Sequence, residues 1–150
     1  RMAFVKLAMK PIDEWFQQYG ESHCNPTNKS IHWVCVPAIT YTLLGLLWAL
    51  SPYALLVFSL VALVFYLALS VRMASAMLAL VGVMGWSFTL FPREMLVISC
   101  LVVFVLAWMG QFIGHIIEGR KPSFFKDIQF LLVGPIWLLG FLFRRFGVSY

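Results

Sequence analysis

The chain of 150 residues is 62% hydrophobic and only 11% charged, and its mean hydropathy is +0.90. Soluble domains are about 45–50% apolar and about 25% charged, so this composition excludes an ordinary soluble domain and indicates an integral membrane protein. The net charge of +5 comes from basic residues scattered between apolar runs, which excludes a continuous stripe for nucleic acid and fits basic loops on the cytoplasmic side of a membrane.

The length allows one all-α membrane domain over residues 1–150. At about 20 residues per crossing, such a chain can supply four or five transmembrane helices with short ends. We expect residues 1–30 to hold an interfacial helix and a histidine-containing loop, and residues 31–143 to form a polytopic helix bundle. The lipid bilayer is then a partner of most of the surface.

The first predicted element is a short amphipathic helix over residues 11–19. Ile12, Trp15 and Tyr19 recur at helical spacing, while acidic and amide side chains occupy the other face. Gly20 suits the end of this helix. The segment is too short and too polar to cross a bilayer, so we expect it to lie in the interface.

Four long apolar runs follow, and each is predicted to cross the membrane as a helix. Polar breaks separate them, such as Ser51-Pro52 after the first run and Arg72 after the second. Gly82 and Gly85 in the third run are candidates for close helix packing. The predicted spans are residues 31–50, 53–70, 73–90 and 95–117.

The last apolar stretch, residues 128–143, follows a basic loop and is interrupted by Gly134-Pro135. If it crossed the membrane, Arg144 and Arg145 would lie opposite the other basic clusters, which the positive-inside rule disfavours. We therefore predict four full spans and a broken or re-entrant C-terminal segment, with five spans as the alternative.

The chain has three histidines, and the predicted topology brings them to one membrane face. His32 opens the first span, His23 precedes it by a few residues, and four crossings return the chain to the same side at His115. Glu118 lies one helical turn after His115. Ionisable groups at membrane depth are rare unless they pair or bind something, so this group is a candidate site.

Three imidazoles and a carboxylate are metal ligands. Imidazoles bind zinc, iron, copper or nickel, and the carboxylate of Glu118 would make the set more suited to iron or manganese. Such a set leaves open positions on a six-coordinate ion for a substrate and dioxygen. Glu118 can be a ligand and take part in catalysis, it can fix an imidazole, or it can pair with Arg120 or Lys121.

Other polar residues near the histidines are candidates for substrate contact. Arg120 and Lys121 can hold lipid headgroups or the carboxylate of an amphiphile. Gln111 lies one turn before His115 and can orient that imidazole. Asn25-Pro26 predicts a turn, and Asn28 can cap the first span. The substrate candidates are Asn25, Asn28, Gln111, Arg120 and Lys121.

The cysteines do not predict a disulfide framework, because they are odd in number and have no CxxC spacing. Cys35 and Cys100 are expected to be small apolar residues of the spans. Cys24 is either a loop thiol or a soft metal ligand.

Two other functions compete with a metal-dependent enzyme. His32 and His115 could be axial ligands of a b-type haem. A small transporter or channel is the second alternative, for which the interrupted segment at Gly134-Pro135 is the best argument. The spans contain almost no charge, which argues against a polar path.

The stretches HCNPTNKSIHWVCVP, from His23, and GQFIGHIIEGRKP, around His115, together resemble the small membrane family of 2-hydroxy fatty acid dioxygenases of sphingoid-base degradation. The resemblance extends from about Glu14 to Phe143. Some members have a second histidine where this chain has Cys24.

The resemblance implies an Fe(2+)-dependent enzyme of lipid α-oxidation that is embedded in a membrane. We expect this membrane to be a bacterial inner membrane or the endoplasmic reticulum membrane, and the positive-inside rule predicts the site on the cytoplasmic face. It implies that a long-chain 2-hydroxy fatty acid and dioxygen react to give a fatty acid one carbon shorter and carbon dioxide. His23, His32 and His115 would hold the iron, with Glu118 as a fourth ligand or a support.

Overall fold

A computed structural model of the chain describes residues 10–150, which form helices and no strand, so the predicted all-α class is confirmed. The first nine residues of the predicted N-terminal segment lie outside this part. The elements are α2 (Ile12–Glu21), α3 (Pro26–Leu50), α4 (Pro52–Leu69), α5 (Val71–Phe88), α6 (Arg93–Glu118), the 3-10 helix η1 (Ser123–Phe125) and α7 (Phe130–Arg145).

Within the described residues, four helices are long and apolar enough to cross a membrane, namely α3, α4, α5 and α6. Their bounds agree with the predicted spans to within a few residues. Much of their surface is apolar and exposed, as at Val64, Ile98 and Leu106, and such faces suit contact with lipid. The helix α7 has 16 residues and is not among the four.

The helix α3 begins earlier than predicted because Asn25, and not Asn28, is its cap. The Asn25 side chain accepts hydrogen bonds from the backbone N–H groups of Thr27 and Asn28 at 2.9 and 3.4 Å. Pro26 occupies the first helical position, where its missing N–H costs nothing. Asn28 is therefore a buried residue of the first turn, and the prediction that it caps the helix is wrong.

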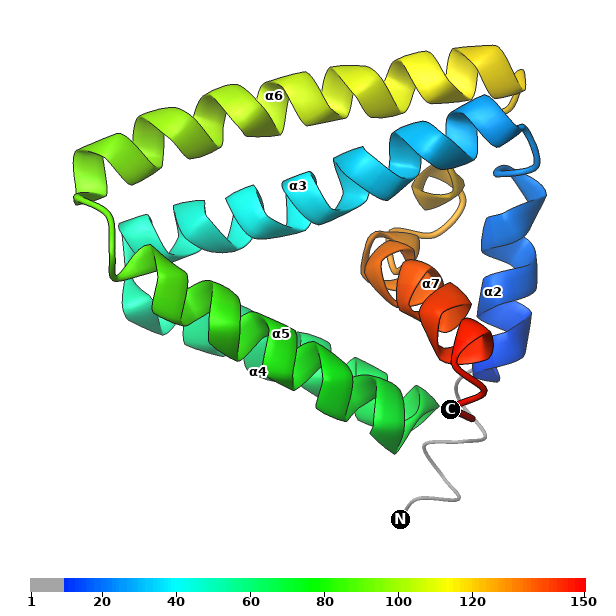
Figure 1. The fold of residues 1–150 in the computed structure, drawn as a ribbon, viewed down its shortest axis with the longest axis horizontal. Helices are drawn as coiled ribbons and strands as arrows, with labels where there is room; N and C mark the ends of the chain where they lie inside the picture. Colours follow the sequence, from blue (N-terminus) through cyan, green and yellow to red (C-terminus); the bar gives the residue numbers. More distant parts are fainter. Residues whose placement is uncertain (1–9) are drawn as a thin grey trace.

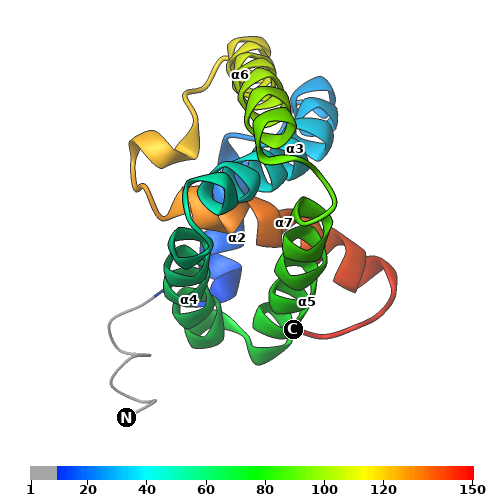
Figure 2. The same ribbon diagram turned by 90° about the vertical axis from the view of Figure 1, so that its left-hand side faces the viewer.

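The four long helices form two pairs that diverge from a common end (Figure 1). One pair is α3 with α6 and the other is α4 with α5. The short connections from α3 to α4 and from α5 to α6 lie where the pairs meet. At the open end, α2 and α7 lie between the pairs, as the view in Figure 2 also shows. The start of α3 and the end of α6 thus share the open end.

Small residues allow α3 and α6 to pack closely. A methyl group built on Gly110 would lie 2.8 Å from Sγ of Cys35, and one on Gly45 would lie 2.8 Å from Sγ of Cys100. These contacts are typical of membrane helices that meet through small side chains. The prediction for Gly82 and Gly85 was wrong, because a methyl group on either would meet nothing within 4 Å.

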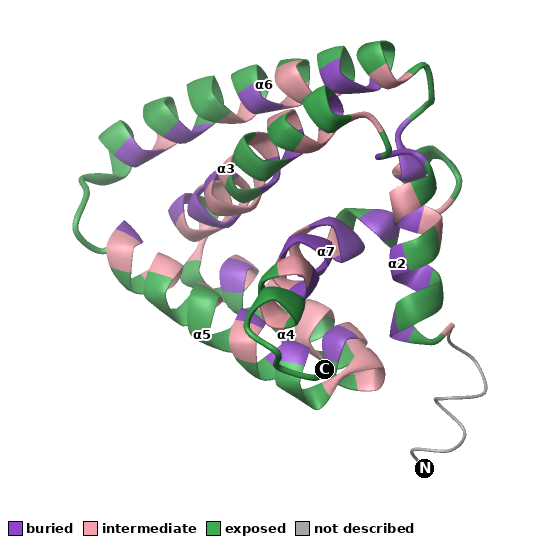
Figure 3. Cartoon of the chain, turned by 45° about the vertical axis from the view of Figure 1, so that its right-hand side comes forward, coloured by how far each residue is buried: buried purple, intermediate pink, exposed green. Residues whose placement is uncertain are grey.

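Buried residues gather in two clusters. One lies where the pairs meet and includes Leu44, Phe88 and Cys100. The other lies at the open end, where Trp15 of α2 and Trp137 of α7 pack with residues of α3, α4 and α5. Figure 3 shows this burial on α2 and α7, while the outer side of α6 is exposed. Tyr19 and Trp137 of this second cluster pack against the ring of His23.

The helix α7 runs without a break through Gly134 and Pro135, so the predicted interruption there is wrong. Pro135 is near the helix start and removes a single backbone hydrogen bond. Gly134 is needed for packing, because a methyl group on it would lie 3.1 Å from the hydroxyl of Tyr19 in α2. Packing against α2 therefore stabilises the helix despite the proline.

Replacing Gly114 of α6 with alanine should destabilise the protein by about 1–3 kcal/mol, because the added methyl group would overlap Oδ1 of the buried Asn28. The matched control is Gly82→Ala, where the space is open and alanine should be neutral or should stabilise the helix by up to about 1 kcal/mol. Unfolding of both variants in detergent measures the difference. Equal effects of the two changes would contradict the packing of α3 on α6.

Candidate metal centre

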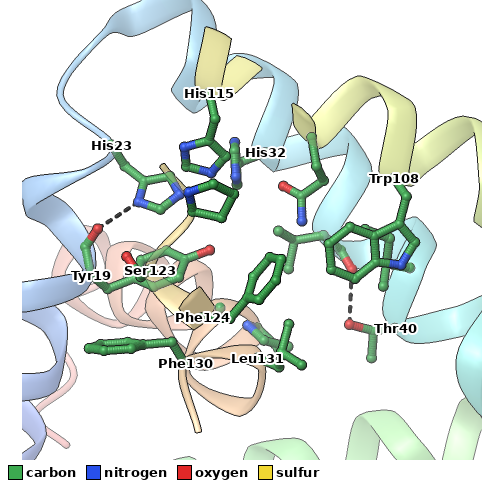
Figure 4. Close-up of a pocket in the computed structure, with 16 residues that line it drawn as sticks. Tyr19, His23, His32, Thr40, Trp108, His115, Ser123, Phe124, Phe130 and Leu131 are labelled. Carbon is green, nitrogen blue, oxygen red and sulfur yellow. Dashed lines mark hydrogen bonds between the residues drawn. The ribbon is translucent and has the colours of Figure 1, made fainter. Parts of the chain in front are cut away.

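Three buried imidazoles meet at the open end of the bundle (Figure 4). The ring centres of His23 and His32 are 4.3 Å apart, and His115 lies 4.9 Å from each. One ring nitrogen of each residue lies within 4.8 Å of the others. They come from the α2–α3 connection, the second turn of α3 and the last turn of α6. The sequence predicted this meeting from the number of crossings.

Backbone carbonyls fix two of the imidazoles. Nδ1 of His23 lies 2.6 Å from the carbonyl of Tyr19, and Nδ1 of His32 lies 2.9 Å from the carbonyl of Asn28. A carbonyl only accepts, so each Nδ1 carries the proton and donates it. Each Nε2 is then left with a lone pair, which is the form that binds a metal.

Two nitrogens in the cluster are buried with no partner among residues 10–150. They are Nε2 of His23 and Nδ1 of His115. A buried polar atom without a partner costs about 1–3 kcal/mol, so such atoms are rare without a function. A metal ion would satisfy both nitrogens, and three neutral imidazoles are a suitable donor set for a divalent transition metal. The residues present therefore fit a metal.

The surroundings of His23 include residues that the sequence analysis did not single out for the site. The ring of Tyr19 stacks on His23 at 4.1 Å between centres. The hydroxyl of Ser22 lies 3.2 Å from Nδ1 of His23 and 2.6 Å from the hydroxyl of Ser123 in η1. The spacing of four residues between Tyr19 and His23 was visible in the sequence. No local pattern marks Ser123, which lies far from His23 in the sequence, in η1 after α6.

Burial keeps His23 neutral. Burial, together with repulsion from the neighbouring His32, lowers the pKa of His23 from 6.5 to about 3. The pKa of Tyr19 is raised by burial, so its phenol stays protonated beside the histidine. A metal ligand must be the neutral imidazole, and His23 is therefore ready for binding without losing a proton near neutral pH.

The metal-free protein should lose stability as the pH falls from about 6.5 toward about 3. In this range His23 binds a proton in the unfolded state and not in the folded state, so acid favours unfolding, whereas above it the contribution is fully present. The free energy of unfolding of chelator-treated protein, followed against pH, measures this. His23→Gln should make the profile less steep. An unchanged profile in that variant would show that other groups cause the acid sensitivity.

Glu118 contacts the loop that carries His23. Its oxygens accept hydrogen bonds from the backbone N–H groups of Cys24 and Asn25 at 2.6 and 2.7 Å, and Asn28 donates from its side chain at 3.5 Å. The carboxylate does not join the group of three imidazoles. Glu118 thus ties the start of α3 to the end of α6.

The five candidates for substrate contact lie at different distances from the three histidines. Gln111 lines a pocket of about 50 Å³ beside the three histidines, and its Oε1 is buried with no partner in the described chain. Asn25 caps α3 and Asn28 fixes His32 through its carbonyl, so neither lines this pocket. Arg120 and Lys121 are exposed beyond the end of α6. Only Gln111 of these five residues faces the site.

A family model described as 2-hydroxy-palmitic acid dioxygenase Mpo1-like matches residues 9–146. No curated protein and no solved structure matches the chain. The matched residues include all three histidines and all the helices described above. The sequence resemblance is thereby confirmed, and the chain belongs to the Mpo1-like family of 2-hydroxy-palmitic acid dioxygenases.

Proposed function

We propose that the protein is an iron(II)-dependent dioxygenase that shortens long-chain 2-hydroxy fatty acids by one carbon. One acid and one dioxygen would give the shorter acid, carbon dioxide and water, which balances the atoms. The observation that carries this proposal is the buried group of His23, His32 and His115, with two nitrogens that have no partner in the described chain, in a member of a family named for this chemistry.

The three histidines would hold the iron, which when bound supplies the Lewis-acid and redox chemistry that dioxygen needs. The carbonyls of Tyr19 and Asn28 keep the rings of His23 and His32 in the binding tautomer. Oε1 of Gln111 is an acceptor for the proton of the substrate's 2-hydroxyl group, because it is buried in the pocket wall with no partner in the described chain.

Two features in and near the pocket would support the reaction, one by excluding water and one by holding His23 in position. The aromatic rings of Trp108 and Phe124 lie 5.5 Å apart at the pocket wall and limit the entry of water. Glu118 holds the His23 loop against α6, so that the third imidazole stays in place when substrate enters. Glu118 therefore acts as a positioning residue in this proposal.

The basic residues support a cytoplasmic site. Lys29, Lys126 and Arg145 lie in or next to the segments at the histidine end of the bundle, whereas Arg93 lies at the opposite end, where α6 begins. By the positive-inside rule the histidine end faces the cytoplasm. The host membrane would be a bacterial inner membrane or the endoplasmic reticulum.

The geometry favours a single ion over the two alternatives. A pocket of about 50 Å³ is far smaller than the roughly 300–1,000 Å³ sites that enclose drug-sized ligands, so a haem has no room between His32 and His115. The transporter alternative relied on a broken helix at Gly134-Pro135, and that helix is continuous.

The decisive experiment measures metal content and oxygen uptake on the same purified sample. We expect close to one iron per chain and oxygen uptake with a long-chain 2-hydroxy acid, with carbon dioxide released in equal amount. The matched control is the fatty acid of the same length without the hydroxyl group, which should give no uptake. A zinc-filled protein that consumes no oxygen after iron exchange, or one with a haem absorption band, would contradict the proposal.

A further inference from the structure

A second and larger cavity adjoins the histidine pocket. It has a volume of about 280 Å³ and lies among α3, α4, α5, α6 and α7. The two spaces share part of their walls, so they are neighbours in the bundle. The residues that line both are Ile39, Thr40, Trp108, Leu131 and Pro135.

The cavity leads away from the histidines, toward the end where the helix pairs meet. Along α3, Leu44 lies 12 residues beyond His32, which is about 18 Å of helix. Phe58 and Val81 line the cavity on α4 and α5. These two residues pack against the buried cluster where the helix pairs meet, and Leu44 is part of that cluster, so the cavity ends against this cluster.

The cavity offers almost no polar recognition. The hydroxyl of Thr40 donates to the carbonyl of Val36 at 2.9 Å, and that of Tyr66 donates to the carbonyl of Leu132 at 2.7 Å. Both hydroxyl protons are therefore used within the protein, and the rest of the wall is apolar except for the side chains of Ser59 and Trp108. Such a space suits a hydrocarbon chain and no polar ligand.

We propose that this cavity holds the hydrocarbon tail of the acid whose polar end binds at the three histidines, and that Leu44, Phe58 and Val81 set the longest tail that fits. This inference rests on the proposed function for the identity of the polar end. The cavity wall and the bilayer interior are both apolar, so moving the tail of the acid from lipid into the cavity gains little free energy. The length of the cavity, and not its apolar character, then decides which acids bind. The shared wall favours the substrate's own tail over that of a bilayer lipid.

Val81→Phe tests the proposal, because it fills the deep end and leaves the histidine pocket unchanged. The matched control is Val83→Phe on the same helix, since Val83 is 64% exposed on the outer surface. A series of 2-hydroxy acids of increasing length is measured for binding, by displacement of a fluorescent fatty acid in nanodiscs, and for oxygen uptake.

We expect Val81→Phe to weaken binding of the longest acids by about tenfold or more relative to the shortest, because overpacking a filled space costs this much. Val83→Phe should follow the wild type. Phe58→Ala should extend the range toward longer acids. If Val81→Phe does not fold, Ala62→Phe blocks the same cavity from α4.

The outcomes separate this inference from the proposed function. A length shift specific to Val81→Phe in binding, without oxygen uptake by the wild type, would support the tail site and overturn the reaction. Oxygen uptake by the wild type with identical length profiles in Val81→Phe and Val83→Phe would support the reaction and overturn the tail site. Loss of a copurified phospholipid from Val81→Phe, with unchanged binding of the acids, would assign the cavity to a bilayer lipid and also overturn it.

Discussion

Replacing any one of His23, His32 and His115 with alanine should remove bound iron and oxygen consumption together. Loss of a hydrogen-bonding partner of a ligand typically costs about 10–100-fold in metal affinity or activity, so loss of a ligand itself should cost more than about 100-fold. Metal analysis and oxygen uptake at equal concentrations of folded protein measure both effects.

The control for these variants is Gln111→Ala. Gln111 lines the same pocket but lies outside the group of three imidazoles, so its variant should retain iron while binding the 2-hydroxy acid more weakly. A single hydrogen bond of this kind is worth about 1 kcal/mol, which is about a fivefold rise in KM. If one of the alanine variants at a histidine keeps both iron and turnover, that histidine is not a ligand and the proposed centre is wrong.

The sequence could predict the meeting of the histidines because it depends on only two properties of the chain. The lengths and hydropathy of the apolar runs fix the number of crossings, and an even number of crossings returns His115 to the side of His32. Neither property depends on how the helices pack. His23 follows because it is close in sequence to the start of α3.

Helix packing was harder to predict, because the sequence does not show which face of a helix meets a partner. Gly82 and Gly85 were as plausible as Gly110 and Gly114, yet only the second pair contacts another helix. Their spacing of four residues is the better signal, since it places both on one face. The stacking of Tyr19 on His23 and the contact of Ser123 likewise depend on tertiary structure.

The position of Cys24 decides between the two roles expected for it, a loop thiol and a soft metal ligand. Sγ of Cys24 is exposed and lies 3.3 Å from the carbonyl of Gly20, on the loop rather than among the three imidazoles. Only its backbone N–H contributes to the site, through Glu118. Cys24 is therefore a loop thiol, and its contact with Glu118 is made by the backbone and not by the side chain.

The role of Glu118 leads to the second large effect. Glu118→Ala should destabilise the protein by about 1–3 kcal/mol, because hydrogen bonds from the backbone N–H groups of Cys24 and Asn25 to a charged acceptor are lost. Glu118 is partly exposed, so water replaces some of this loss. The His23 loop is then less well held, and iron affinity should fall by about 10–100-fold, as for the loss of other supporting groups.

Titration with iron distinguishes this support from direct ligation. If Glu118 only positions the loop, excess iron should restore oxygen uptake in Glu118→Ala, because the three imidazoles are intact and only the cost of ordering the loop must be overcome. In Glu118→Gln the amide oxygen can replace one carboxylate oxygen, whereas its NH2 group opposes the second N–H donor, so the variant should lie between alanine and the wild type. If neither variant recovers at any iron concentration, as expected for the alanine variants at the histidines, the carboxylate is a fourth ligand that moves to the metal when it binds.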